Sequence, residues 1–149
     1  MSASITITIK IDPSELEAAL ERVQALMADK RPITRRVKGV MERAAEENFD
    51  EQGRPKWIDL KPATKKAREK RGTWPGSILV ETGQLASSIE GDFDKDSAWT
   101  SSNKKYAATH QFGDDERNID ARPFLDLTDD DWEEIADIVQ QEFDAAIAG

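Results

Sequence analysis

The chain contains 149 residues with no cysteine, one histidine and a net charge of −9. This length fits one domain with its own core, and the lack of cysteine excludes disulfides, thiolate metal sites and cysteine nucleophiles. No apolar run approaches the roughly 20 residues of a membrane-spanning helix, and the first residues lack the pattern of a signal peptide. We therefore expect a single domain over residues 1–149, made in the cytosol, with no membrane partner.

The charge is distributed unevenly along the chain. Residues 1–29 carry 2 basic and 5 acidic side chains, residues 30–72 carry 14 and 7, and residues 73–149 carry 5 and 18. Their net charges are therefore −3, +7 and −13. Such a separation can drive head-to-tail contact between copies, and it is also consistent with charges that mix on the folded surface.

The first 28 residues predict a strand followed by a helix. Isoleucine alternates with polar residues over Ser4–Ile11, which is the pattern of a half-buried strand. Asp12 and Pro13 then favour the start of a helix over 13–28, because aspartate caps helices and proline suits the first helical position. Spacings of three and four residues predict its buried face. That face consists of Leu16, Leu20, Val23 and Met27.

A second helix and a long hydrophilic connection follow. Arg31-Pro32 interrupts the chain, and Thr34 is the expected cap of a helix that runs to about Phe49. Its apolar face consists of Val37, Val40, Met41, Ala44 and Ala45. Residues 50–77 are rich in glycine, proline and charge, and they include a short helix over Pro62–Arg71. A connection of this length is functional or partly mobile.

A hairpin is the main feature predicted between residues 78 and 102. Residues 78–88 form a turn into a short helix with Gly83 as its hinge. Ile89–Phe93 and Ala98–Ser102 then form the two strands, closed by a turn at Asp94-Lys95-Asp96.

The C-terminal part is predicted to contain a short and a long helix. Tyr106–Phe112 is a helical turn that ends at Gly113, and Ile119–Leu127 is extended because Pro123 opposes helix. Thr128 and the acids after it cap a helix over 129–147. Its expected buried face consists of Trp132, Ile135, Val139, Phe143 and Ile147.

Together these elements predict an α+β fold. A small, mainly antiparallel β-sheet is packed by two N-terminal helices and a long C-terminal helix. The sheet contains residues 4–11, 89–93 and 98–102, and in one arrangement 119–127 as well.

The titratable residues do not form a recognisable catalytic motif. His110 is the only histidine, and its spacing from Tyr106 places both on one helix face, as packing with a hydrogen bond requires. Consecutive carboxylates at 129–131 point about 100° apart on a helix, so they cannot all bind one ion. We therefore expect a protein that is not an enzyme, with no catalytic residue, cofactor or metal. A hydrolase centred on His110 is the most remote alternative.

The basic tract over residues 54–71 suggests a different class of function. Its lysines and arginines lie close to Trp57 and Trp74, and such interleaving can bind phosphates and stack on bases. Lys65, Lys66 and Arg68 are the candidate phosphate contacts. Glu69, the overall acidity and the lack of a base-reading motif oppose this hypothesis. A DNA-contacting protein therefore remains the alternative function. If the tract does not bind DNA, it is a solvated helix surface or a surface that contacts an acidic protein.

Arg122 lies between Ala121 and the Pro123-Phe124 pair. The proline restricts the backbone and the phenylalanine anchors it, so the guanidinium is held in a fixed place. A rigid arginine suits contact with a carboxylate, either within the fold or across a subunit boundary.

Four segments occur in a distinctive order. They are Trp57-x-x-Leu60 before a basic helix, Ile78 to Leu85 with Thr82-Gly83, Tyr106 to Gly113 with His110, and Ala121-Arg-Pro-Phe-Leu125. In this order they resemble the phage virion morphogenesis family, which contains the tail completion proteins of P2-like and Mu-like phages. The resemblance implies positions of fold or subunit contact rather than catalysis. These are Trp57, Leu60, Gly83, Leu85, Tyr106, His110, Gly113, Arg122, Pro123 and Phe124.

By this resemblance the chain is a tail completion or terminator protein without enzymatic activity or cofactor. The resemblance implies a closed ring, commonly hexameric, at the head-proximal end of a phage tail. The ring helps to join the tail to the head. The expected partners are copies of the chain, the tail tube, the neck proteins and DNA that passes through the channel without specific binding. The expected location is the virion, after assembly in the host cytoplasm. A stopper or adaptor of the neck is the alternative position.

The charge of −13 over residues 73–149 motivates a further expectation. An acidic lining of the channel would repel phosphates and let DNA pass without sticking.

Overall fold

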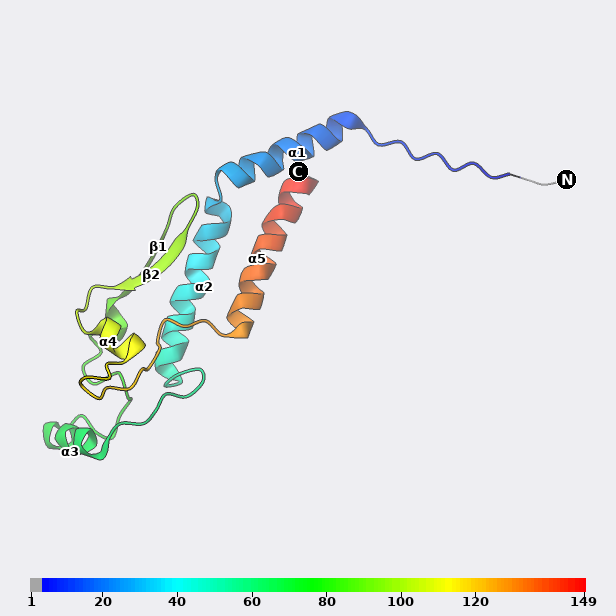
Figure 1. Cartoon of the computed structure of the whole chain (residues 1–149). Helices are drawn as coiled ribbons and strands as arrows, with labels where there is room; N and C mark the ends of the chain where they lie inside the picture. Colours follow the sequence, from blue (N-terminus) through cyan, green and yellow to red (C-terminus); the bar gives the residue numbers. More distant parts are fainter. Residues whose placement is uncertain (1–3) are drawn as a thin grey trace.

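The computed structural model describes residues 4–149, and within them it contains five α-helices and one two-stranded sheet. In Figure 1, α2 stands between the hairpin and α5, α1 crosses one end, and α3 lies beyond the other end. The helices are α1 (Pro13–Ala28), α2 (Arg31–Asp50), α3 (Pro62–Arg71), α4 (Ala107–Phe112) and α5 (Asp129–Ala148). The sheet consists of β1 (Ile89–Phe93) and β2 (Ala98–Ser102), and the short 3-10 helix η1 (Ala86–Ser88) precedes it.

The helix boundaries follow the local capping chemistry in most places. Asp12 accepts a hydrogen bond from the Ser14 N–H at 2.9 Å and begins α1. Thr128 and Asp131 form a reciprocal capping box at the start of α5. The predicted bounds of α1 and α3 are confirmed, and α5 extends one residue beyond its expected end.

The predicted cap of α2 is wrong. This helix begins at Arg31, with Pro32 in its first turn, and Thr34 is a buried residue within it. The Thr34 hydroxyl donates instead to the Asp94 carbonyl at 2.7 Å, which ties α2 to the hairpin. Proline is compatible with a first helical turn because the N–H that it lacks has no partner there.

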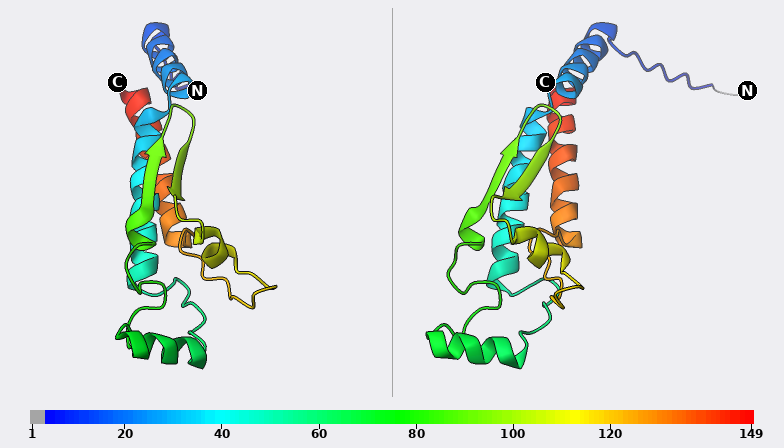
Figure 2. Two further views of the ribbon diagram at one scale, coloured as in Figure 1. Left: turned by 90° about the vertical axis from the view of Figure 1, so that its left-hand side faces the viewer. Right: turned by 60° about the vertical axis from the view of Figure 1, so that its left-hand side comes forward.

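The hairpin agrees with the prediction. β1 and β2 are antiparallel, with Ile89 opposite Ser102 and Phe93 opposite Ala98. The Asp94 carboxylate accepts from the N–H groups of Asp96 at 2.8 Å and Ser97 at 2.7 Å, which closes the turn. The hairpin packs along α2, and Figure 2 shows the two elements side by side from two directions.

The prediction that Ser4–Ile11 is a strand is wrong for the isolated chain. These residues form an extended arm without secondary structure, and the four isoleucines are between 71% and 90% exposed. A strand needs a neighbouring backbone to pair with, and α1, about 24 Å long, carries the arm away from the hairpin (Figure 1). Ile119–Leu127 contributes only an isolated bridge between Ile119 and Asp114. The α+β class is confirmed, but the sheet has two strands.

The buried faces predicted for the outer helices are also partly wrong. On α1 only Leu26 is buried, whereas Leu16, Leu20 and Met27 are exposed. On α5 the buried apolar residue is Ile138, whereas Trp132 is 58% exposed and Ile147 is 56% exposed. Each helix packs through one narrow face, α5 on α2 and α1 on the end of α5. Periodicity shows that a helix has an apolar face but not what covers it.

The core lies where the end of α2 meets the hydrophilic connection and the segment around residue 124. The Phe49 ring contacts Trp57 edge-on at 5.9 Å between centroids and Phe124 at 5.4 Å. The buried cluster consists of Phe49, Trp57, Ile78, Leu85, Ala107 and Phe124. Residues 50–77 are thus partly built into the core through Trp57. No helix in residues 4–149 is long and apolar enough to cross a membrane.

Phe124→Ala should lower the free energy of unfolding by about 3–5 kcal/mol, because it removes a fully enclosed ring and leaves a cavity. Only 1% of Phe124 is exposed. Denaturant unfolding followed by tryptophan fluorescence measures the change. Phe112→Ala is the matched control, since that ring is exposed, and it should change stability by no more than about 0.5 kcal/mol. Equal losses in the two variants would contradict this account of the core.

Candidate functional site

Residues 121–127 belong to the connection between α4 and α5 and cross the C-terminal end of α2. We call this segment the strap. The Arg122 N–H donates to the His110 carbonyl at 2.7 Å. The N–H groups of Phe124 and Leu125 both donate to Gln111 Oε1 at 3.0 Å. The last turn of α4 therefore holds the strap by its backbone.

The carbonyl groups of the strap bind to two other elements. Trp57 Nε1 donates to the Pro123 carbonyl at 2.9 Å. Asn48 Nδ2 on α2 donates to the carbonyls of Phe124 at 3.0 Å and Asp126 at 2.9 Å. Because buried backbone groups need partners, these side chains allow an irregular segment to cross the interior.

The hydrogen bonds of Arg122 lie within its own fold and go to backbone carbonyls, whereas the sequence predicted a carboxylate partner. Its guanidinium is buried and donates to the carbonyls of Ile58 at 2.8 Å and Asp59 at 3.0 Å. The Asp120 carboxylate is 4.0 Å away. Burial lowers the pKa of Arg122 from its ordinary value, while Asp120 and Asp59 favour the charged form. Arg122 therefore fixes the hydrophilic connection to the strap.

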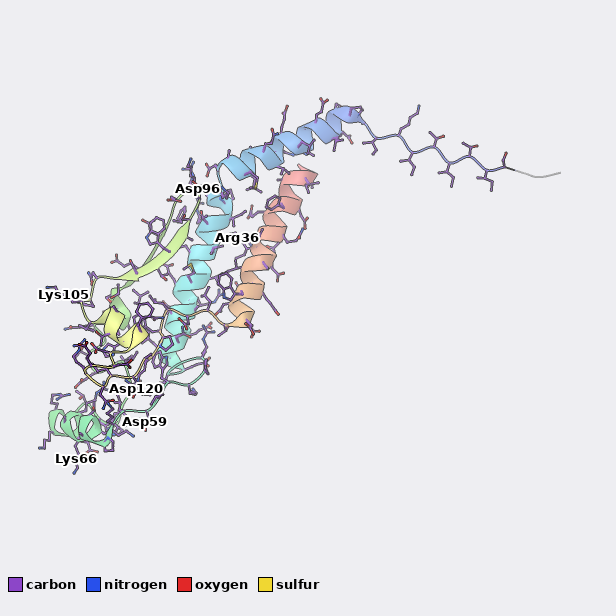
Figure 3. The ribbon with its side chains drawn as sticks, in the orientation of Figure 1. Arg36, Asp59, Lys66, Asp96, Lys105 and Asp120 are labelled. Carbon is purple, nitrogen blue, oxygen red and sulfur yellow. The ribbon has the colours of Figure 1, made fainter. Side chains whose placement is uncertain are left out.

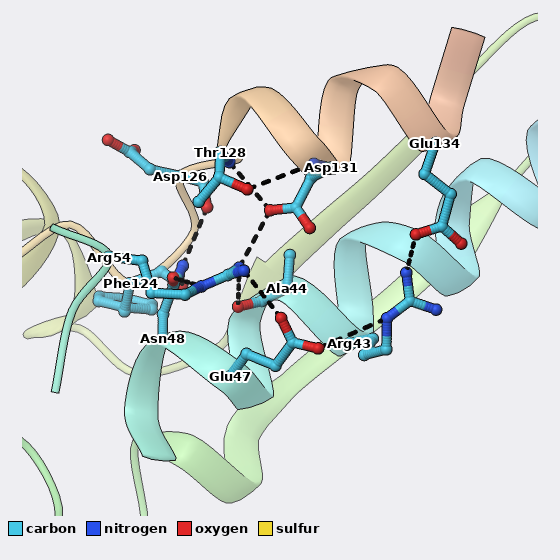
Figure 4. A network of polar contacts seen from close by, with 10 residues as sticks. All are labelled: Arg43, Ala44, Glu47, Asn48, Arg54, Phe124, Asp126, Thr128, Asp131 and Glu134. Carbon is cyan, nitrogen blue, oxygen red and sulfur yellow. Dashed lines mark hydrogen bonds and ion pairs between the residues drawn. The ribbon is translucent and has the colours of Figure 1, made fainter. Parts of the chain in front are cut away.

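A network of polar side chains extends from the strap to the start of α5 (Figure 4). Arg54 Nε donates to Asn48 Oδ1 at 2.9 Å, and its terminal nitrogens contact Glu47 at 2.8 Å and Asp131 at 3.0 Å. Burial opposes the charge of Asp131, but hydrogen bonds from Thr128 and the charge of Arg54 lower its pKa overall. The same carboxylate therefore caps α5 and binds the hydrophilic connection.

His110 packs against Tyr106 beside the strap. Its ring meets Tyr106 edge-on at 5.9 Å, and its Nδ1 is buried without a hydrogen-bond partner among residues 4–149. Burial lowers the pKa of His110, and the positive charges of Arg122 and Arg68 lower it further. The imidazole is therefore neutral near pH 7, and its predicted position on one face with Tyr106 is confirmed.

His110 lines two small cavities together with Arg68. Two cavities of about 200 and 170 Å³ share His110, Arg68 and Leu79 in their walls. The Arg68 guanidinium donates to the carbonyls of Ser77 at 2.9 Å and Ile78 at 2.7 Å. Within the described part of the chain, no three His, Asp or Glu side chains gather as metal ligands would.

The three candidate phosphate contacts do not form one surface. Arg68 is buried on the inner side of α3, so its assignment as a phosphate contact is wrong for this structure. Lys65 pairs with Asp59 at 2.6 Å and lies 5.2 Å from the Trp74 ring centroid. Of these three residues only Lys66 is fully exposed, and it projects from α3 into solvent (Figure 3).

The remaining predicted positions support the core in different ways. Leu85 is buried, Leu60 packs against the core cluster, and Tyr106 is partly exposed. Gly83 and Gly113 have φ values of 76° and 77°, in the region that glycine adopts readily. A Cβ at Gly113 would lie 2.8 Å from the Ala121 nitrogen, so only glycine allows the strap to pass there.

Sequence reasoning missed Asn48, Arg54 and Gln111, which supply most of the polar contacts of the site. Asn48 offered one signal, because an amide on the apolar side of α2 must find a buried partner. Arg54 and Gln111 stand among other polar residues, and nothing in their spacing distinguishes them.

Comparison with known proteins agrees with a structural role. The sequence matches the phage virion morphogenesis family over residues 11–144. It is 36% identical over 138 residues to the Mu-like prophage FluMu G protein 2 of Haemophilus influenzae, covering 89% of this chain and 92% of that protein. It is 29% identical over 154 residues to the putative capsid assembly protein G of Escherichia phage Mu, covering 97% and 98%. No solved structure matches the chain.

These similarities indicate a structural protein of virion assembly. The chain belongs to the phage virion morphogenesis family.

Asn48→Ala should lower the free energy of unfolding by about 1–3 kcal/mol, because two strap carbonyls and Arg54 Nε lose a buried partner. Thermal and denaturant unfolding measure the loss. Gln140→Ala is the control, since its amide binds only the exposed Asp144 at 2.8 Å. A loss in Asn48→Ala no larger than in this control would show that the amide does not hold the strap.

The lowered pKa of His110 should make the free energy of unfolding fall as the pH falls. Its folded pKa is lowered from 6.5, so the unfolded chain takes up a proton first. The stabilisation is complete above pH 6.5 and declines as the pH falls from 6.5 toward the folded pKa. Unfolding measured from about pH 8 to about pH 5 should show a shallower decline in His110→Gln than in the native protein. Identical declines would exclude His110 as the cause.

Proposed function

We propose that the chain is a tail completion or terminator protein without enzymatic activity. In this role it forms a closed ring, with six copies as the expected number, at the head-proximal end of a phage tail and helps to join the tail to the head. The observation that carries the proposal is the match to the virion morphogenesis family over residues 11–144. The family match supports a role in virion assembly, and the position in the tail or neck is our proposal.

The internal contacts of the site support a structural protein. Arg68 and Arg122 donate to backbone carbonyl groups, and the partly buried ring of His110 packs against Tyr106. Their chemistry holds irregular backbone in a fixed position, which an assembly protein needs in order to present constant surfaces to its neighbours.

The distribution of charge supports contact between copies. α3 carries five basic residues and one acid, whereas α5 carries eight acids and no base. Figure 1 places α3 at one end of an elongated molecule, far from the C-terminal end of α5. Opposite charges on separate parts of one subunit favour heterologous contacts, which form closed rings when the rotation between copies closes.

The acids of α5 also support the passage of DNA without specific binding. A ring with α5 on its inner side would present a negative wall to the phosphates of the genome and repel them. The burial of Arg68 and the pairing of Lys65 with Asp59 weigh against a DNA-binding surface on α3.

Loss of the gene from the phage that carries it should yield DNA-filled heads and separate tails rather than joined virions. Electron microscopy of the lysate counts each particle, and the native gene supplied in trans should restore infectivity. The name of the phage Mu relative refers to capsid assembly. A lysate with normal free tails and no heads would therefore favour that role and contradict the proposed one.

A further inference from the structure

The N-terminal arm of residues 4–11 is an extended segment with the sequence pattern of a strand. Its isoleucines at positions 5, 7, 9 and 11 are among the most exposed apolar side chains of the molecule, and Figure 3 shows the arm extending into open space. Strict alternation with Thr6, Thr8 and Lys10 is the pattern of a strand that buries one face. A row of exposed isoleucine in an extended segment indicates an interaction surface.

The arm cannot reach the sheet of its own chain. Arg22 fixes α1 to the end of α5 by donating to the carbonyls of Ala146 at 2.7 Å and Ile147 at 2.9 Å. The hairpin turn meets the opposite end of α1, where the Lys30 N–H donates to the Lys95 carbonyl at 2.9 Å. About 24 Å of helix therefore separates the arm from the hairpin.

The sheet offers one accessible edge. On β1, the Glu42 side chain lies against Gly91 and accepts from its N–H at 3.0 Å, so that edge is occupied. The Asp94 N–H bonds to the Ser97 carbonyl, and strand alternation then directs the N–H groups of Ala98 and Thr100 away from β1. Among residues 4–149 no other group bonds to these two N–H groups. An unpaired edge of this kind accepts an added strand.

An apolar surface lies beside this edge, between β2 and α5. α2 directs Thr34 toward the hairpin and Val40 toward Ile138 of α5. A rotation of 100° per residue places Val37 and Met41 between these two directions, on the side of β2. Both side chains are only half-buried.

α5 adds its own apolar residues to the same side. Glu134 and Gln141 of α5 contact Arg43 and Arg36 on the opposite side of α2. The helical repeat therefore places Trp132, Val139 and Phe143 on the side that faces the hairpin. Val139 and Phe143 are half-buried, and Trp132 is exposed. We call Val37, Met41, Trp132, Val139 and Phe143 the apolar strip.

We propose that residues 4–11 of one copy form a third strand on the free edge of β2 in a neighbouring copy, with their isoleucines on its apolar strip. This inference rests on the proposed ring, since each copy supplies one arm and one edge and a closed ring satisfies all of them. Charge favours this partner as well. The arm carries Lys10 and no acid, whereas residues 89–102 carry four acids and one base.

Disulfide trapping tests the pairing, because the native chain contains no cysteine. With the isoleucines facing the apolar strip, Thr6 and Thr8 share the outer face of the sheet with Ser101. Thr6→Cys or Thr8→Cys protein, mixed with Ser101→Cys protein and oxidised, should give a dimer on a non-reducing gel. Glu46→Cys, on the β1 side of α2, is the matched control and should not be trapped. Trapping with Glu46→Cys in place of Ser101→Cys would overturn the assignment to β2.

A second experiment measures the contribution of the isoleucine face. The double variant Ile7→Lys/Ile9→Lys should raise the dissociation constant of the oligomer by about a hundredfold or more, since it places two charges against an apolar surface. The control Thr6→Lys/Thr8→Lys alters the opposite face and should change it by less than about fivefold. Sedimentation over a range of protein concentrations gives both values. Neither change affects the fold of a single chain, whose core contains no arm residue.

The outcomes separate this inference from the proposed function. An unchanged oligomer mass in Ile7→Lys/Ile9→Lys, with normal joining of heads and tails in the phage, would overturn the strand exchange and leave the tail role standing. A native protein that is monomeric at every concentration would overturn the ring and the exchange together. Separate heads and tails in a phage that carries the Ile7→Lys/Ile9→Lys gene would support both.

Discussion

The fold depends on the hydrogen bonds of one buried side-chain amide, that of Asn48. Asn48 is fully enclosed on α2, and its amide binds the carbonyls of Phe124 and Asp126 while its oxygen accepts from Arg54. A buried polar group without partners is costly, so α2, the hydrophilic connection and the strap must come together at this point. Arg54 extends the constraint to Asp131 and so to the start of α5. A segment that would otherwise be a loose loop becomes the centre of the core.

The two ends of the molecule differ because of this arrangement. Around the strap, three elements share aromatic contacts and buried hydrogen bonds, and each holds the others in place. At the other end, α1 is attached mainly through Arg22 and its packing on α5, and the isoleucines of the arm beyond it are exposed. Leu16, Leu20 and Met27 of α1 are exposed together with the isoleucines of the arm. The end around the strap sets the shape of the chain, and the open end carries the surface that we propose for contact with neighbouring copies.

These properties are consistent with membership in a family of virion assembly proteins. The residues most characteristic of the chain, Arg122, Pro123 and Phe124, form internal contacts, and His110 stays neutral because burial and two arginines lower its pKa. Arg122 is buried and binds backbone carbonyls, and His110 is partly buried beside Tyr106. The proposed contact surfaces of the protein lie where apolar residues remain exposed in the single chain.

Local chemistry in the sequence determined the helix caps at Asp12 and Thr128, the bounds of α3 and the hairpin, because each of these depends on residues within a few positions of one another. The sequence also showed that residues 4–11 form a potential strand and that α1 and α5 have apolar faces, but not what covers them. The tertiary structure decided that Arg68 is buried, that Arg122 binds its own fold, and that Asn48 holds the strap. Those contacts join residues that are 9 to 78 positions apart. Their formation depends on how the whole chain packs, which no short segment can specify.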